Sequence, residues 1–509
     1  MPRGLRTVTL RRIGWIALVV SLLLAGIAFP ASAPAQRGLV TGLSAVDLYQ
    51  TRDASVRAFW FDRTVDADAG IVRLLIQWAG LTPPGFAPQE RPPDPTNPAF
   101  YNLISIDRAV RDATARGVQV MITVNTAPDW AEGPEQPATV AEGAWKPNPS
   151  DVADLMQALA ARYTGSYDPD GAGPQPPLPA VKALQVWNEP NHERWLAPQF
   201  EGNQITGADR YREILNASYN AIKAVNPGVL VVTGGTSPYG DPPPGGPHAP
   251  GGMAARPVQW WEKLLCVQPA KSKKKGKKSK QVRYARAAGC AGKPLFDVFA
   301  HQPIDNTGKG PLQSGPSRYD ASTPDLGRVV AVLRAAERLG TVSAGPHPVW
   351  ATEFWWDSNP PNPVGVPLDV QARWIEQSLY LFWKAGADTA INFQIRDTTL
   401  YPDTRNGLQS GLYFLDGSPK PALTAFRFPF VTERLDQRTL RAWGKAPEAG
   451  RLRIQRLQGG RWKTVNKLGV GKSKVFVTKL RLRGKQRLRA KVRGSTSIVW
   501  IQSTLENRG

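Results

Sequence analysis

The feature that most constrains the fold is an alternation, between about residues 38 and 430, of short apolar runs with amphipathic stretches of helical period. Apolar runs of this length are typical of buried parallel strands, and the stretches between them of crossover helices. The runs cover residues 39–43, 71–78, 118–125, 181–188, 229–234, 296–301, 348–354 and 389–394, and the longest helical stretches cover residues 102–116, 151–163, 208–225, 325–339 and 369–385. Eight such units predict a closed (β/α)8 TIM barrel, although a doubly wound sheet would give a similar period.

Polar and aromatic side chains stand where these apolar runs end, and this favours the barrel. In a barrel the carboxyl ends of all strands meet at one mouth, where active sites lie. The residues in question are Trp78, Asn125, Asn188, Glu189, His301, Glu353 and Gln394. We therefore expect them to surround one pocket.

After Phe430 the pattern changes to short segments that alternate apolar residues with Arg or Lys. This alternation is typical of antiparallel strands with one buried face. The sequence thus predicts a barrel domain over residues 37–431 and a small antiparallel β-sandwich domain over residues 437–509.

The first 36 residues have the layout of an export signal: four arginines, then an apolar run over residues 13–29, then small residues. We expect a secreted or cell-surface protein, with an uncleaved membrane anchor as the alternative. In an oxidising compartment the two cysteines, Cys266 and Cys290, are expected to form a disulfide rather than to stay as free thiols. Four His and two Cys without ligand-like spacing predict no metal site, and no cofactor is expected.

The net charge of +23 is uneven along the chain. Residues 437–509 contain 20 Lys and Arg against 2 Glu, and residues 271–293 contain 10 against no acidic residue. The lysine run 271–280 has no interleaved aromatic residues, so nucleic acid is not the expected partner. The hypothesis is that this basic loop and the basic C-terminal domain hold the protein on an anionic polymer of the cell envelope, with a solubilising surface as the alternative.

Two glutamates carry the prediction of function. Glu189 lies in the motif Trp187-Asn188-Glu189-Pro190-Asn191, and Glu353 closes the seventh apolar run. Hydrolysis of a glycosidic bond needs one carboxyl group to protonate the leaving oxygen and a second to meet the positive charge that develops on the sugar. A structural ion-pair role for both carboxylates is the alternative.

At these residues the chain resembles glycoside hydrolase clan A, which includes families 5 and 39. Asn188-Glu189 is similar to the acid/base motif that ends the fourth strand of these barrels, and Glu353 to the nucleophile that ends the seventh. The resemblance implies retaining hydrolysis of a β-linked polysaccharide or oligosaccharide. It also implies that Asn188 binds the sugar hydroxyl beside the reacting carbon and that Arg73 keeps the nucleophile ionised.

The remaining site candidates have structural alternatives. His301 is expected to orient or polarise groups near Glu353, or else to be a core histidine. Trp130, Trp355 and Trp356 are candidate platforms for sugar rings, with packing as the alternative. Glu193 is expected to be a solvated charge.

Two other functions remain open from the residues alone. Transglycosylation would use the same two glutamates with a sugar hydroxyl as acceptor. A non-catalytic glycan-binding or adhesion protein on the same barrel would be expected to lack one of the carboxylates, and this sequence has both.

Overall fold

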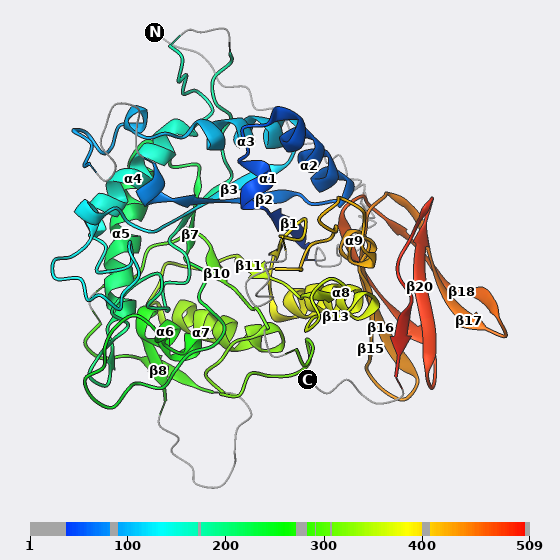
Figure 1. Ribbon diagram of the computed structural model, residues 1–509. Helices are drawn as coiled ribbons and strands as arrows, with labels where there is room; N and C mark the ends of the chain where they lie inside the picture. The colour runs from blue at the N-terminus through cyan, green and yellow to red at the C-terminus, as the bar shows by residue number, and fades with distance from the viewer. Residues whose placement is uncertain are drawn as a thin grey trace, which may run out of the picture. The chain divides into compact units, whose positions relative to one another are not determined.

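Eight parallel strands form a single sheet in the computed structural model (Figure 1), which describes residues 37–81, 90–171, 175–270, 282–290, 292–305, 308–399 and 408–503. The strands are β1 Val40–Ser44, β2 Ile71–Gln77, β3 Gln119–Asn125, β4 Ala183–Val186, β7 Leu230–Thr233, β10 Phe299–His301, β11 Val349–Phe354 and β14 Thr389–Phe393. They follow one another around the sheet in chain order, with β14 beside β1. Parallel bridges between Val232 and Val298 and between Thr236 and His301 join β7 to β10 and close the ring. The prediction of a β/α barrel is confirmed.

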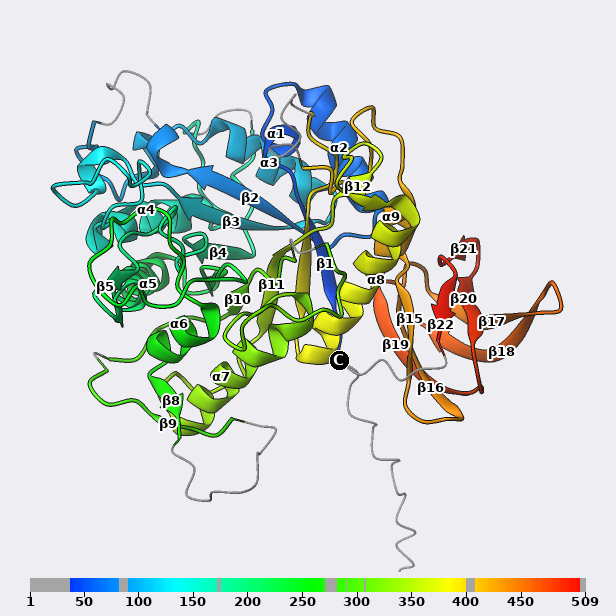
Figure 2. The ribbon, with the colours of Figure 1, turned by 60° about the horizontal axis from the view of Figure 1, so that its bottom comes forward.

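Helices alternate with these strands, as the sequence predicts (Figures 1 and 2). They are α1 Val46–Tyr49, α2 Ala54–Asp66, α3 Ile104–Ala115, α4 Pro149–Arg162, α5 Gly207–Val225, α6 Pro257–Leu264, α7 Leu326–Leu339, α8 Leu368–Ala385 and α9 Pro421–Arg427, with 3-10 turns η1 Trp78–Gly80, η2 Pro98–Phe100, η3 Asp129–Ala131 and η4 Thr323–Asp325. Local signals set their ends. The side chains of Asp53 and Asn148 accept the first free N–H groups of α2 and α4. Gly340 and Gly386 end α7 and α8 in the left-handed conformation that glycine adopts without strain.

The barrel interior is filled in layers. The lower layer is apolar and includes Met121, Val232, Trp350 and Ile391. Gly42 of β1 also belongs there, because a Cβ at this position would lie 2.6 Å from the side chain of Ile71. Above this layer the inward-facing residues become polar, so polar side chains line the mouth of the barrel.

The C-terminal residues form two antiparallel sheets (Figure 2). One sheet contains β15 Phe430–Arg434, β16 Thr439–Ala446 and β19 Lys474–Arg481, and the other contains β17 Gly450–Gln458, β18 Arg461–Val470, β20 Gln486–Val492, β21 Ser495–Thr496 and β22 Trp500–Gln502. Buried side chains of both sheets, such as Leu440, Leu480, Ile454 and Leu488, belong to one apolar core, which continues into the barrel. The predicted antiparallel β-sandwich is confirmed.

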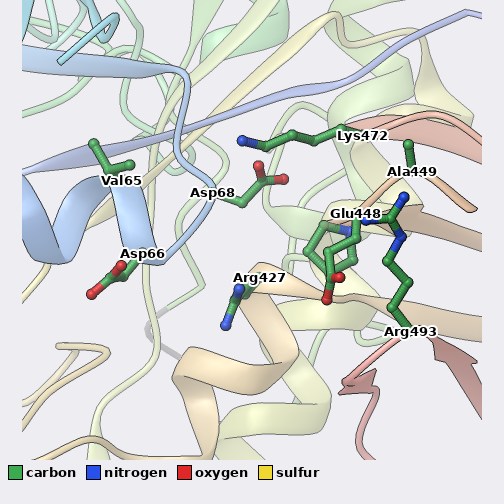
Figure 3. A pocket seen from close by; sticks show the side chains of 9 residues that line it. Val65, Asp66, Asp68, Arg427, Glu448, Ala449, Lys472 and Arg493 are labelled. Carbon is green, nitrogen blue, oxygen red and sulfur yellow. The ribbon is translucent and has the colours of Figure 1, made fainter.

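Polar contacts also join these sheets to the barrel. Lys445 of β16 is almost fully buried and forms an ion pair with Asp68, which also accepts a 2.6 Å hydrogen bond from Ser473. A cavity of about 400 Å³ lies beside this contact and is lined by charges of both signs (Figure 3). Residues 37–509 form one compact unit, so the division into domains near residues 431–437 stays a prediction.

Short two-stranded pairs extend the loops of the barrel. Two are antiparallel, β5 Phe200–Glu201 with β6 Gln204–Ile205 and β8 Val267–Pro269 with β9 Tyr284–Arg286, and one is parallel, β12 Ser358–Asn359 with β13 Val366–Pro367. A disulfide joins Cys266 to Cys290. The predicted export signal and the lysine run 271–280 lie outside the described residues. Among the helices of the described residues, none is long and apolar enough to cross a membrane.

Candidate active site

The segment after β4 is shaped by two residues with left-handed backbone. Trp187 has φ 74° and Glu189 has φ 40°, a conformation that costs energy in residues other than glycine and is concentrated at functional sites. Tertiary contacts hold it in place. The N–H of Glu189 donates to the carbonyl of Gly235 after β7 (3.0 Å), and the indole of Trp187 donates to the carbonyl of Trp195 (2.7 Å). The carboxyl group of Glu189 is thereby fixed at the mouth of the barrel.

Arg73 of β2 connects the groups at the mouth. Its Nη1 donates to Oε2 of Glu353 at 2.8 Å, and its Nη2 donates to Oδ1 of Asn188 at 2.7 Å. Its Nε donates to Thr123 at 3.0 Å and to Gln185 at 3.2 Å. With only 2% of its surface exposed, the guanidinium fork links the ends of β4 and β11 in a dry environment.

The two carboxyl groups have different electrostatic surroundings. Burial, reinforced by the charge of Glu353, raises the pKa of Glu189 to about 7, and the hydrogen bond from the indole of Trp195 (3.0 Å) opposes this rise. Burial also raises the pKa of Glu353, but there the guanidinium of Arg73 opposes it directly. Near neutral pH, Glu353 is the better-stabilised anion, and Glu189 is the group that can hold or release a proton.

The structure thus brings together Glu189, Glu353, Asn188 and Arg73. It adds two contacts that the sequence analysis missed. Trp195 binds Glu189, and Nε2 of Gln302 donates to Oδ1 of Asn188 at 2.9 Å. Gln302 follows directly after the sixth strand, and this position could have identified it as a site residue. No local sequence signal identifies Trp195.

His301 is not brought to the carboxylates. Its Nε2 bonds the carbonyl of Ala321 (2.5 Å), and its Nδ1 bonds the hydroxyl of Thr236 (2.7 Å), which accepts from the indole of Trp261 (2.8 Å). Burial lowers the pKa of His301 to about 4, so the ring is neutral. Nε2–H therefore donates to Ala321 and Nδ1 accepts from Thr236, which leaves no ring nitrogen for Glu353. This is the arrangement of a core histidine.

The three candidate tryptophans lie in different surroundings. Trp356 is buried, packs on Trp374 at 4.6 Å and donates to Ser378 (3.1 Å), so its role is packing. Trp130 and Trp355 are only partly buried. Trp130 meets Trp78 edge-on at 5.3 Å, and Trp355 lies two residues after Glu353. These two remain candidate platforms for a sugar.

The expectation of a solvated Glu193 is wrong. Its carboxylate is fully buried and accepts hydrogen bonds from the backbone N–H groups of Gln199 (3.1 Å), Gly251 (2.6 Å) and Met253 (3.1 Å). The charge is compensated by backbone donors, which can satisfy a buried carboxylate. Glu193 therefore holds together the loops that follow β4 and β7.

Unpaired polar atoms remain at the mouth. Asn125, at the end of β3, is fully buried, and neither atom of its amide has a partner among the described residues. Its place two residues after the inward-facing Thr123 puts it on the same inner face of the strand. Oε1 of Gln302 is buried and unpaired as well. Since such groups are costly to leave unsatisfied, they are suited to bind hydroxyl groups of a ligand.

The described residues contain no group of three or more His, Cys, Asp or Glu side chains that could hold a metal ion. The site described above offers two carboxyl groups, one paired with a guanidinium and one with an indole.

No protein-family model matches the sequence, and no curated protein matches it either. The structure is similar to that of a family 39 glycoside hydrolase from Bacteroides cellulosilyticus, with a TM-score of 0.51 and 15% identity over 88% of this chain and 81% of that chain. A monomeric β-xylosidase from Caulobacter crescentus (TM-score 0.47, 15% identity, 89% and 94% covered) and a glucosidase from Croceicoccus marinus (0.47, 14%, 88% and 94%) are more distant. The first similarity confirms, for the fold, the resemblance to clan A inferred from the sequence.

Proposed function

We propose that the protein is a retaining glycoside hydrolase that cleaves O-glycosidic bonds of a β-linked polysaccharide or oligosaccharide. The proposal rests on one observation: the two carboxyl groups at the ends of β4 and β11 have different electrostatic surroundings. Arg73 pairs with Glu353, whereas burial and the neighbouring charge raise the pKa of Glu189 to about 7. A nucleophile that is ionised beside an acid that is protonated is the combination that this reaction requires.

The first step forms a covalent glycosyl-enzyme intermediate. The carboxylate of Glu353 attacks the anomeric carbon while the bond to the leaving oxygen breaks, and Glu189 transfers its proton to that oxygen. Asn188, held between Arg73 and Gln302, is positioned to bind the hydroxyl next to the reacting carbon.

The second step releases the sugar. Glu189, now a carboxylate, removes a proton from a water molecule, whose oxygen attacks the anomeric carbon and displaces Glu353. Each step inverts the configuration of the anomeric carbon, so after both steps the product has the configuration of the substrate. A sugar hydroxyl in place of water would give transglycosylation.

The test is a panel of aryl β-glycosides and polysaccharides, with the product configuration followed by NMR. Glu353→Gln is expected to lose turnover of every substrate. Glu189→Gln is expected to lose turnover of glycosides with poor leaving groups but to keep the first step with a dinitrophenyl leaving group, which needs no protonation.

Glu376→Gln is the matched control. Glu376 lies on α8, burial raises its pKa well above the usual value, and its Oε2 accepts from the backbone N–H of Phe430 (3.1 Å). The isosteric amide should therefore leave turnover unchanged. Turnover by Glu353→Gln, or an inverted product, would refute the assignment. Added alcohol acceptors distinguish hydrolysis from transglycosylation.

We further propose that the chain is exported and meets an anionic polymer of the cell envelope. The N-terminal pattern supports export, and the excess of basic residues in 271–293 and 437–509 supports the choice of partner.

A further inference from the structure

Strands β18, β17 and β20 are neighbours in one sheet (Figure 2), and their sequences place many basic residues on one face of it. Along β17, Leu452 and Ile454 are buried in the sandwich core, whereas Arg451 and Arg453, which alternate with them, are exposed. Because side chains alternate along a strand, the two arginines point away from the core.

The neighbouring strands continue this face. Arg453 lies directly opposite Lys467 of β18 on one side and opposite Lys491 of β20 on the other. Directly opposed residues of antiparallel strands project to the same face, so these three charges form a row across the sheet, with a separation of about 4.8 Å between strands.

Further along the same face, Arg487 and Arg489 of β20 add two more positive charges. Arg489 donates to Gln455 (2.9 Å) and lies 4.1 Å from the ring centre of the half-buried Trp462. We call the six residues Arg451, Arg453, Lys467, Arg487, Arg489 and Lys491 the basic sheet face.

No acidic side chain of residues 37–503, as far as they are described, balances the basic sheet face. Among the described residues, none of the six forms an ion pair with a carboxylate. Residues 437–503 contain a single acidic residue, Glu448, and its carboxylate accepts a hydrogen bond from Ser495. Like charges placed directly opposite each other destabilise a sheet. A ligand that supplies the missing negative charge would remove this cost.

One end of the basic sheet face is open. Gly469 lies opposite Arg451, and nothing stands within 4 Å of the position that a Cβ would take there. A shallow hollow of about 290 Å³ follows, lined by Gly450, Arg451, Lys467, Leu468 and Gly469. The described residues therefore leave room for a ligand beside Arg451 and Lys467.

We propose that the basic sheet face binds a linear acidic polysaccharide, a polyuronate that carries one carboxylate on each sugar. The distance between neighbouring strands, about 4.8 Å, is comparable to the length of one sugar residue, and the face offers Arg side chains, which pair well with carboxylates. The choice of a polysaccharide among polyanions rests on the proposed glycosidase function. The proposal deepens that function by naming the polymer on which the barrel is retained.

The experiment measures the affinity of the full chain for polygalacturonate, with neutral dextran, duplex DNA and phosphatidylglycerol vesicles as comparison ligands. The test variant is Arg453→Gln/Lys467→Gln/Lys491→Gln. The control variant, Arg108→Gln/Lys182→Gln/Arg338→Gln, removes the same charge from exposed positions of the barrel. A third variant, Arg453→Lys/Lys467→Arg/Lys491→Arg, keeps the charge of the row.

The native chain, the control and the charge-keeping variant are expected to bind polygalacturonate in a salt-dependent manner, and the test variant to bind about tenfold or more weakly. Equal losses in the test and control variants would overturn the proposal, because only net charge would then matter. Tighter binding of DNA or vesicles than of polygalacturonate, or no binding of polygalacturonate, would overturn it as well. Glu353→Gln should bind like the native chain, so failure of the glycosidase proposal and failure of this one can be told apart.

Discussion

The hydrogen bond from Trp195 to Glu189 predicts where the alkaline limb of the pH profile lies. Glu189 must be protonated to donate to the leaving oxygen, so activity falls as pH rises through its pKa, about 7. The indole N–H lies 3.0 Å from Oε2 and stabilises the carboxylate more than the neutral acid. Trp195→Phe removes this donor and keeps an aromatic ring. The pKa of Glu189 should therefore rise, and the alkaline limb should move to higher pH.

The size of the shift follows from the energies of hydrogen bonds. A bond to a charged acceptor contributes about 1.5–3 kcal/mol, and a bond to a neutral acceptor about 0.5–1.5 kcal/mol. The difference of about 1–1.5 kcal/mol corresponds to about one pKa unit. The measurement is kcat/KM against pH with a substrate whose leaving group is poor, because only such a substrate depends on the proton of Glu189.

Trp356→Phe is the matched control, because the indole of Trp356 donates to Ser378 and not to a carboxyl group. Its profile should keep the native limb. An alkaline limb that stays in place in Trp195→Phe, or that moves to lower pH, would show that the indole does not govern the protonation of Glu189.

Two further predictions concern buried charges. Arg73→Met leaves Glu353 without its cation, so the pKa of Glu353 should rise. Because Glu353 must be ionised to attack, the acidic limb of kcat/KM should move to higher pH. Urea unfolding should show that the free energy of unfolding falls by about 3–5 kcal/mol. Lys445→Met leaves the carboxylate of Asp68 without its cation between the barrel and the β-sandwich, and the free energy of unfolding should fall by about 3 kcal/mol in the same assay. The double variant Asp68→Asn/Lys445→Met should lose less. An equal loss in the single and double variants would contradict this reasoning.

Local patterns in the sequence were sufficient to locate the barrel strands. The predicted run 71–78 corresponds to β2 Ile71–Gln77, and the run 389–394 to β14 Thr389–Phe393. The fourth run was predicted to residue 188, but β4 ends at Val186 because Trp187 turns into the left-handed region. Such a turn is held by contacts with Gly235 and Trp195, which a local pattern does not contain.

Local sequence patterns could predict the candidate site only in part. The position of a residue at a strand end could be predicted, but the direction of its side chain could not. His301 stands at such an end, yet its ring bonds Thr236 and Ala321 in the core. The local sequence around Glu193 predicts an ordinary surface charge, because backbone N–H groups of a distant loop donate to it.

The sequence by itself determines where the strands and helices form, because hydrophobic periodicity is a local property of each segment. It also contains the two glutamates and their places at the ends of strands. Which groups meet is a property of the closed barrel. Arg73 reaches Glu353 across 280 positions of sequence, and the indole of Trp195 reaches Glu189 only because the intervening loop folds back. Closure of the ring and burial together turn two similar carboxyl groups into a stabilised anion and a proton donor.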